Sequence, residues 1–402
     1  MAVQQKTTPQ KAILPINPDI LVWARERSGL DIECVARKVG VKPNKIVAWE
    51  SGGASPTPRQ GRLLAKEYKR PFLEFFASSR PEIPETELVP DFRSYTEGPT
   101  ETERRSLKEI QRWAEEQRLN ALSLIEEMGE KPPLLPENLK CRIRDNVNVS
   151  ARIAREEIGF PIQEQLNLST SEQRRLPDIL RSKIEDIGVL VLRRSELTKL
   201  RARGICLFAK PLPTIVFGNE APSAQAFTMV HEFGHVLLES SAISGYSQSR
   251  SSNLTGSEEI ESWCNRFAAS FLIPSDALEG LVNKPPQPDK DFDAQKLSTL
   301  AKSFSISRHV MLIRLVHLGY VEQDFYWEKM RPIFLSEEER SKKGFGRPPY
   351  YGRRYVNRQG LFYTGLVLEA WSSGAITGHN AAEYMGIKNL AHLRDIREDF
   401  RV

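Results

Sequence analysis

Two histidines and a glutamate stand at a spacing that suits metal chemistry. His231, Glu232 and His235 form the pattern HExxH. On a helix, positions i and i+4 share one face, so both imidazoles can reach one metal ion while the glutamate leans toward the same opening. This arrangement is typical of zinc hydrolases: the histidines bind Zn²⁺, the glutamate takes a proton from water, and the metal polarises a carbonyl. The alternative is a pair of surface histidines around a solvated glutamate.

A catalytic zinc ion usually has a third protein ligand besides water. The helix expected at 257–272 begins with Glu258, Glu259 and Glu261. Glu261 lies one turn before Asn265, on the face that we expect to pack, and is therefore the best candidate. Glu258 shares this stripe, and Glu259 is less well placed. Favourable charge at a helix N-terminus explains all three carboxylates equally well.

The elements that must position these residues indicate an α+β fold that is mostly helical. Three short apolar runs, 188–192, 205–208 and 214–217, have the length of strands and precede the HExxH helix, expected at 223–240. They predict a small three-stranded sheet. Residues 275–402 show helical patterns, interrupted at 344–355 by a stretch rich in Gly, Pro, Tyr and Arg.

The HExxH helix and the segment 261–274 together resemble the ImmA/IrrE family of metallopeptidases, which shows HExGH followed by E-x-x-A-N-x-F-A-x-x-L-L-x-P. The resemblance implies a zincin-like core in which His231, His235 and Glu261 bind Zn²⁺ and Glu232 is the general base. It also suggests a downstream tyrosine as oxyanion stabiliser. Tyr246 is the nearest candidate, and an ordinary loop tyrosine is the alternative. Cys264 departs from the family pattern, which has alanine there.

The amino-terminal region predicts a second kind of domain. Five short helices fit at 19–28, 31–39, 43–51, 59–68 and 71–77, separated by glycines and prolines. The segment 47–52 resembles the end of the third helix in the XRE (Cro-type) repressor family. The resemblance implies a helix-turn-helix that reads double-stranded DNA, with Lys42, Asn44 and Lys45 as candidate contacts. The second helix begins with Asp31 rather than the usual Ser-Gln, so a protein partner is the alternative.

Composition places limits on the rest. The 402 residues carry 57 basic and 52 acidic side chains, a mild excess that permits nucleic-acid contact without requiring it. The four cysteines form no CxxC pair, which favours a reducing compartment. We find no signal peptide and no membrane span, so we expect a cytoplasmic protein. Proline-rich linkers suggest three domains: 1–80 helix-turn-helix, 91–285 metallopeptidase and 286–402 helical.

Two functions remain open at the level of sequence. The first is a regulatory zinc peptidase that cleaves a specific cytoplasmic protein, such as a repressor-type regulator, and uses its helix-turn-helix to reach DNA or that partner. The second is a non-catalytic or weakly catalytic antitoxin or autoregulator, paired with a toxin or acting in phage defence. A segment at 378–387 has the rhythm of half a helix-turn-helix and could support a homodimer.

Overall fold

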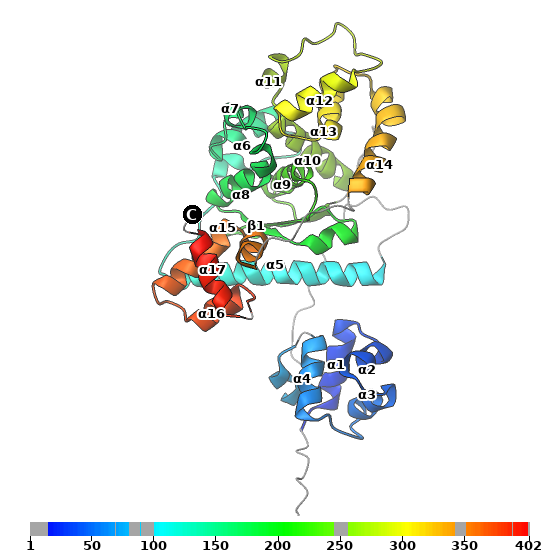
Figure 1. Cartoon of the computed structure of the whole chain (residues 1–402), viewed down its shortest axis with the longest axis vertical. Coiled ribbons are helices and arrows are strands. Elements are labelled where there is room, and N and C mark those ends of the chain that lie inside the picture. The colour runs from blue at the N-terminus through cyan, green and yellow to red at the C-terminus, as the bar shows by residue number, and fades with distance from the viewer. Residues whose placement is uncertain are drawn as a thin grey trace, which may run out of the picture. The chain divides into compact units, whose positions relative to one another are not determined.

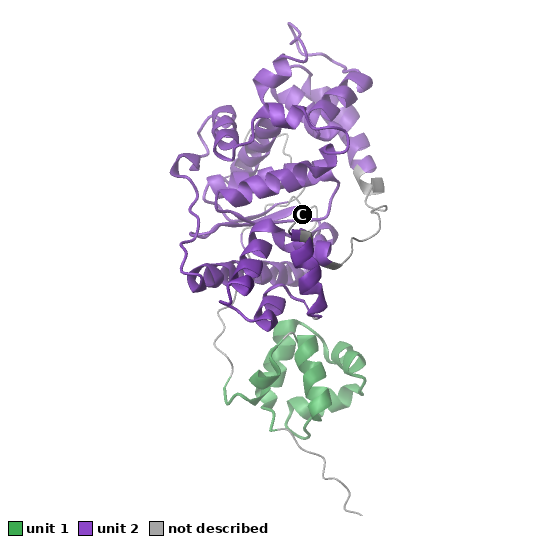
Figure 2. Cartoon of the chain, turned by 60° about the vertical axis from the view of Figure 1, so that its left-hand side comes forward, with its two compact units in different colours: residues 1–86 green, residues 87–402 purple. Residues whose placement is uncertain are grey.

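The chain divides into two compact units. The computed structural model describes residues 15–68, 70–79, 89, 100–244, 256–341, 351–387 and 389–400. The first unit spans residues 1–86 and the second spans 87–402 (Figure 2). The second unit holds both the predicted peptidase domain, 91–285, and the predicted helical region, 286–402. Tyr246 lies outside the described residues.

The first unit contains the five predicted helices. They are α1 (Pro18–Ser28), α2 (Ile32–Val39), α3 (Pro43–Glu50), α4 (Pro58–Tyr68) and a final 3₁₀ helix, η1 (Phe72–Phe76). Their core is formed by apolar side chains from all five, including Ile20, Val35, Ile46, Leu64 and Phe75. Asp31 caps α2 by accepting the backbone N–H of Cys34 at 2.6 Å, as its position in the sequence predicts.

An ion pair ties α3 to α1 in this unit. Arg25 donates to Glu50 through Nε at 2.7 Å and through Nη2 at 3.1 Å, and both side chains are largely shielded from solvent. A two-pronged contact of this kind fixes orientation as well as distance. Glu50 thus faces α1.

The sheet of the second unit has four strands, one more than predicted. They are β1 (Leu190–Arg193), β2 (Gly204–Leu207), β3 (Thr214–Phe217) and β4 (Ala242–Ser244), in the order β1-β3-β2-β4. β1 runs parallel to β3, and the other two pairs are antiparallel. The strand β4 escaped prediction because three residues after a helix are too short to show an alternating pattern.

Both faces of this sheet are covered by helices, which explains why its strands are apolar without alternation. Val191, Cys206 and Ile215 point toward α8 and α9, whereas Leu192, Ile205 and Val216 belong to a second core with α5 and α15. In Figure 1, α8, α9 and α10 lie on one side of the sheet, and α5 lies on the other with α15 and α17.

The helices of the second unit account for most of its length. They are α5 (Glu101–Glu127), α6 (Val147–Glu157), α7 (Ile162–Leu166), α8 (Leu176–Asp186), α9 (Pro222–Leu237), α10 (Gly256–Leu272), α11 (Ser275–Glu279), α12 (Ala294–Ser303), α13 (Arg308–His317), α14 (Arg331–Ser341), α15 (Tyr351–Ser372), α16 (Gly378–Tyr384) and α17 (Ala391–Phe400). Shorter 3₁₀ turns are η2 (Glu137–Leu139), η3 (Gln173–Arg175) and η4 (Ser195–Leu200), and η5 (Phe325–Met330) is a π-helix. Within the described ranges, no helix combines the length and the hydropathy that a membrane span requires.

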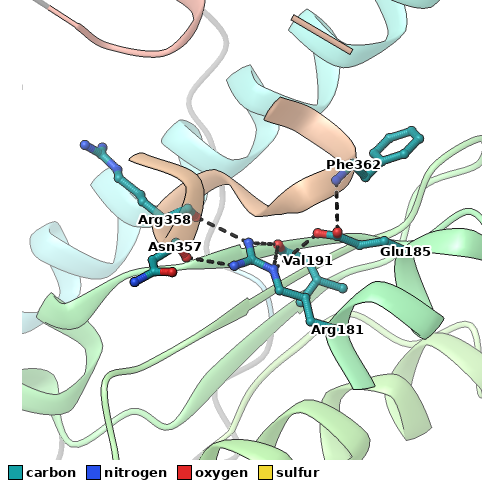
Figure 3. Close-up of polar contacts among 6 residues, drawn as sticks. All are labelled: Arg181, Glu185, Val191, Asn357, Arg358 and Phe362. Carbon is teal, nitrogen blue, oxygen red and sulfur yellow. Dashed lines mark hydrogen bonds and ion pairs between the residues drawn. The ribbon is translucent and has the colours of Figure 1, made fainter. Parts of the chain in front are cut away.

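Helix α15 is interrupted at Gly360, and the buried ion pair of Arg181 and Glu185 hydrogen-bonds to backbone groups on both sides of the interruption. Gly360 has φ 89° and ψ 169°, so the hydrogen-bond ladder of the helix stops there. Arg181 on α8 donates to the carbonyl of Asn357 at 2.7 Å and to that of Val191 at 2.8 Å (Figure 3). Glu185 accepts the N–H of Phe362 at 3.0 Å. The two charges thereby satisfy backbone groups on both sides of the break, besides pairing with each other at 3.2 Å.

We predict that Gly360→Ala destabilises the second unit by about 3 kcal/mol or more. The observed φ and ψ lie in a region that only glycine adopts readily. In addition, a Cβ at this position would lie 2.7 Å from Nη2 of Arg181 and would clash with the Glu185 carboxylate. The measurement is the midpoint of thermal or urea unfolding of the full chain.

Gly374→Ala is the matched control for this prediction. Gly374 also has a positive φ, 82°, but a Cβ there would meet no atom within 4 Å. Gly374→Ala should therefore lower the free energy of unfolding by only about 1–2 kcal/mol, through backbone strain. Equal shifts for the two variants would show that the contact with the ion pair contributes nothing.

Candidate metal centre

Helix α9 carries the HExxH residues into the interior of the second unit. Pro222 occupies its first turn, where a missing N–H costs nothing, and every residue from Thr228 to Leu237 is buried. His231 and His235 are 4% and 0% exposed, and their ring centroids are 5.1 Å apart. The helical spacing therefore places both imidazoles side by side, as the sequence predicts, and excludes the alternative of two surface histidines.

Helix α10 brings Glu261 against these imidazoles. The Cys264 and Phe267 side chains of α10 pack directly on Gly234 of α9, which has no side chain to hold the helices apart. Glu261 Oε1 lies 2.9 Å from His235 Nε2, and Glu261 Oε2 lies 3.3 Å from His231 Nε2. The alternative candidates stay outside this cluster, since Glu259 is exposed and Glu258 is only partly buried.

The electrostatics of this cluster favour the metal-binding forms of Glu261 and His235, whereas His231 would have to lose its proton when a cation binds. Burial would raise the pKa of Glu261, but His231 and His235 outweigh it and hold that pKa at about 2, so the carboxylate is ionised. Burial lowers the pKa of His235, which favours the neutral imidazole. For His231, burial acts in the same direction, but Glu261 outweighs it and the pKa is raised. An ionised carboxylate and neutral imidazoles are the ligand forms that metal binding requires.

The donor set fits a zinc ion. Two imidazole nitrogens and one carboxylate oxygen are buried, and all lie within 4.8 Å of one another. Zn²⁺ favours nitrogen and oxygen donors of this kind, and a 2-His-1-Glu set is one that catalytic zinc uses. A buried carboxylate between two histidines is costly without a positive partner, which gives a physical reason for a cation at this place.

Glu232 lies beside this cluster but does not belong to it. It is fully buried, and neither of its carboxylate oxygens has a hydrogen-bond partner of good geometry among the described residues, although Ser244 is close enough to lower its pKa. Burial raises the pKa of Glu232 to about 8, while His231 opposes this effect and Glu261 adds to it. The carboxylate fits only because Gly204 on β2 has no side chain: a Cβ there would lie 2.6 Å from Glu232 Cδ. A carboxylate with a pKa near neutrality is suited to accept and return a proton.

A cleft of about 140 Å³ opens onto the centre and contains residues that the sequence did not single out. Ser244 on β4 reaches it, as do Arg203, directly before β2, and Tyr326 on the π-helix η5. His309 also lines the cleft, and its Nε2 lies 2.9 Å from the Tyr326 hydroxyl. His317, in contrast, is exposed at the end of α13. No local pattern signals Ser244 or Arg203, because only strand pairing brings them here.

The predicted DNA contacts lie together on the first unit. Lys42 is the residue before α3, and Asn44 and Lys45 occupy its first turn. All three are exposed, whereas Ile46 and Trp49 of the same helix are buried. The third helix therefore presents a polar, positively charged start to solvent.

Comparison with protein families agrees with both parts of this description. Residues 187–316 match the model of a peptidase family described as the IrrE N-terminal-like domain, and residues 21–75 match a helix-turn-helix model. The chain joins a helix-turn-helix domain to an IrrE-like domain. No curated protein and no solved structure matched it in the corresponding comparisons. The two family matches support a DNA-binding regulator that carries a metallopeptidase-like domain.

We predict that His231→Ala, His235→Ala and Glu261→Ala each lower the affinity for zinc by more than about 100-fold. Changes to residues around a metal ligand typically cost about 10–100-fold, and loss of a ligand itself should exceed that. The measurement is zinc content of the purified full chain, followed by competition with a chelator. Glu259→Ala removes an exposed carboxylate from the same helix and should leave the zinc content unchanged. Stoichiometric zinc in all three ligand variants would contradict the assignment.

Proposed function

We propose that this chain is a regulatory zinc metallopeptidase that cleaves a specific protein, with the helix-turn-helix bringing it to DNA or to a partner regulator. The observation that carries the proposal is the buried set of His231, His235 and Glu261, next to a fourth residue, Glu232, that is not needed to hold a metal. A module that only bound a partner would have no use for a second carboxylate buried beside the candidate metal ligands.

Each residue of the candidate metal centre has a distinct role in the proposed peptide hydrolysis. His231, His235 and Glu261 would hold the zinc ion, which supplies a Lewis acid for the scissile carbonyl and lowers the pKa of water. Glu232 takes the proton of the attacking water on its carboxylate and returns it to the nitrogen of the leaving amine. Burial of Glu232 against Gly204 keeps bulk water away from this proton. The cleft lined by Arg203, His309 and Tyr326 is where a peptide carbonyl would lie.

We predict that Glu232→Gln keeps its zinc but loses at least about 100-fold in peptide cleavage, which is the lower range for removal of a general base. The amide has nearly the shape of the carboxylate and cannot accept the proton. Wild type and variant are incubated with the same mixed peptide library, and products are identified by mass spectrometry beside a zinc determination. Wild-type rates in the variant would exclude Glu232 as the base. Zinc binding without cleavage by either protein would favour the antitoxin or autoregulator function.

The helix-turn-helix is proposed to bind double-stranded DNA through the start of α3. Lys42 and Lys45 are exposed there together with Asn44, which suits contacts with phosphates and base edges. We predict that Lys42→Ala and Lys45→Ala each weaken binding to a mixed-sequence duplex and reduce the slope of log K against log salt by about 1. The measurement is fluorescence anisotropy of the full chain at several salt concentrations.

Lys66→Ala is the matched control for these variants. Lys66 is an equally exposed lysine of the first unit, but it lies on α4. It changes the net charge by the same amount and should have a much smaller effect on the slope. If the three variants weaken DNA binding equally, the effect comes from net charge alone, and α3 is not the helix that contacts the DNA bases.

A further inference from the structure

The hydroxyl of Ser244 lies among the three candidate metal ligands. Its Oγ is 3.2 Å from His231 Nε2, 3.3 Å from His235 Nε2 and 3.5 Å from Glu261 Oε1. Ser244 is 2% exposed and is the last residue of β4. One oxygen is therefore nearly equidistant from a donor atom of each of the three residues.

These distances are those between the corners of a tetrahedral metal site. Ligands about 2.0–2.1 Å from a zinc ion in a tetrahedron lie about 3.3–3.4 Å from each other. Glu261 Oε2 lies 3.3 Å from His231 Nε2, and Glu261 Oε1 lies 2.9 Å from His235 Nε2. Ser244 Oγ lies at similar distances from one donor atom of each of the three residues, as a fourth donor of such a site would. In catalytic zinc sites the fourth corner belongs to water or substrate.

The sheet holds the Ser244 backbone in this position. Ser244 is the register partner of Gly204 in the antiparallel pair of β4 and β2, and its carbonyl accepts the N–H of Arg203 at 3.0 Å. Paired residues direct their side chains to the same face, so the Ser244 side chain lies on the face where Glu232 packs against Gly204. The hydroxyl can thus leave the corner by rotating about its Cα–Cβ bond, while the strand stays in place.

We propose that Ser244 is a fourth, exchangeable protein ligand that closes the metal centre at rest. The inference rests on the proposed function and adds a form of regulation to it. With the hydroxyl in place, a bound ion would already have four protein donors, and water or a substrate carbonyl would compete with the hydroxyl for a position. A neutral hydroxyl is not among the usual protein ligands of zinc, so a stronger donor displaces it. A substrate that binds in the cleft and turns the Ser244 side chain away would open the site.

The rival explanation is that Ser244 only donates a hydrogen bond to Glu261 or a histidine and never touches the metal. The two explanations differ in one respect: whether an atom at position 244 lies within bonding distance of the ion. A thiolate reports this contact directly, because sulfur bound to Co²⁺ gives an intense charge-transfer absorption that oxygen and nitrogen ligands do not give.

The first experiment replaces Ser244 with cysteine in the Co²⁺-loaded full chain. Ser244→Cys should gain the sulfur-to-cobalt band, and the wild type, with its four native cysteines, provides the baseline. Thr228→Cys is the matched control, because Thr228 lines the same cleft but bonds Glu220 at 3.0 Å instead of the ligands. A band in Ser244→Cys alone supports the proposal.

The second experiment uses Ser244→Ala and azide as a small probe ligand for the Co²⁺ ion. If the hydroxyl occupies the open corner in about nine molecules of ten, its removal should tighten azide binding about tenfold. The titration is followed by the visible absorption of the Co²⁺ ion. Chelator competition should show that Ser244→Ala retains the metal, since three ligands remain.

The outcomes separate this inference from the proposed function. A wild-type chain that binds no stoichiometric metal would contradict both the role of Ser244 and the proposed peptidase function. A wild type that binds metal, with no sulfur band in Ser244→Cys and unchanged azide affinity in Ser244→Ala, would overturn the role of Ser244 and leave the peptidase proposal intact. A sulfur band together with tighter azide binding would establish a closed resting site.

Discussion

The contact between the Glu261 carboxylate and two imidazoles joins helices that begin 34 residues apart in the chain, α9 at Pro222 and α10 at Gly256. A buried carboxylate costs several kcal/mol unless charge or hydrogen bonds compensate it. Apolar packing must therefore hold the helices together independently. The Trp263 and Phe267 rings stack on α10 at 5.3 Å, and Phe233 of α9 meets Phe267 edge-on at 6.2 Å. These aromatic contacts hold α9 and α10 in the positions that bring the buried polar residues together.

The strands contribute to the same centre in a different manner. β2 provides the space that the Glu232 carboxylate occupies at Gly204, and β4 provides the hydroxyl of Ser244 beside it. Neither contribution depends on helical periodicity. The space for the Glu232 carboxylate and the position of the Ser244 hydroxyl are thus set by one pair of antiparallel strands, whereas the three candidate metal ligands lie on one pair of helices.

Sequence reasoning succeeded where the relevant spacing was local. The fold class, the helix-turn-helix and the helices that carry His231, His235 and Glu261 follow from patterns of three to four residues and from family resemblance. It missed β4, Ser244 and the role of Gly204, because these depend on which strands pair, and pairing joins residues about 40 positions apart.

The ion pair of Arg181 and Glu185 has a consequence for how the molecule can be dissected. The family match ends at residue 316, yet these two charges satisfy backbone groups at 357–362, and α5 and α15 cover a face of the sheet. A fragment limited to residues 187–316 would expose that apolar face. It would also lack Arg181 and Glu185 together with their backbone partners at 357–362. We therefore expect the smallest piece that folds by itself to be much larger than residues 187–316 and to include helices on both sides of that range along the chain.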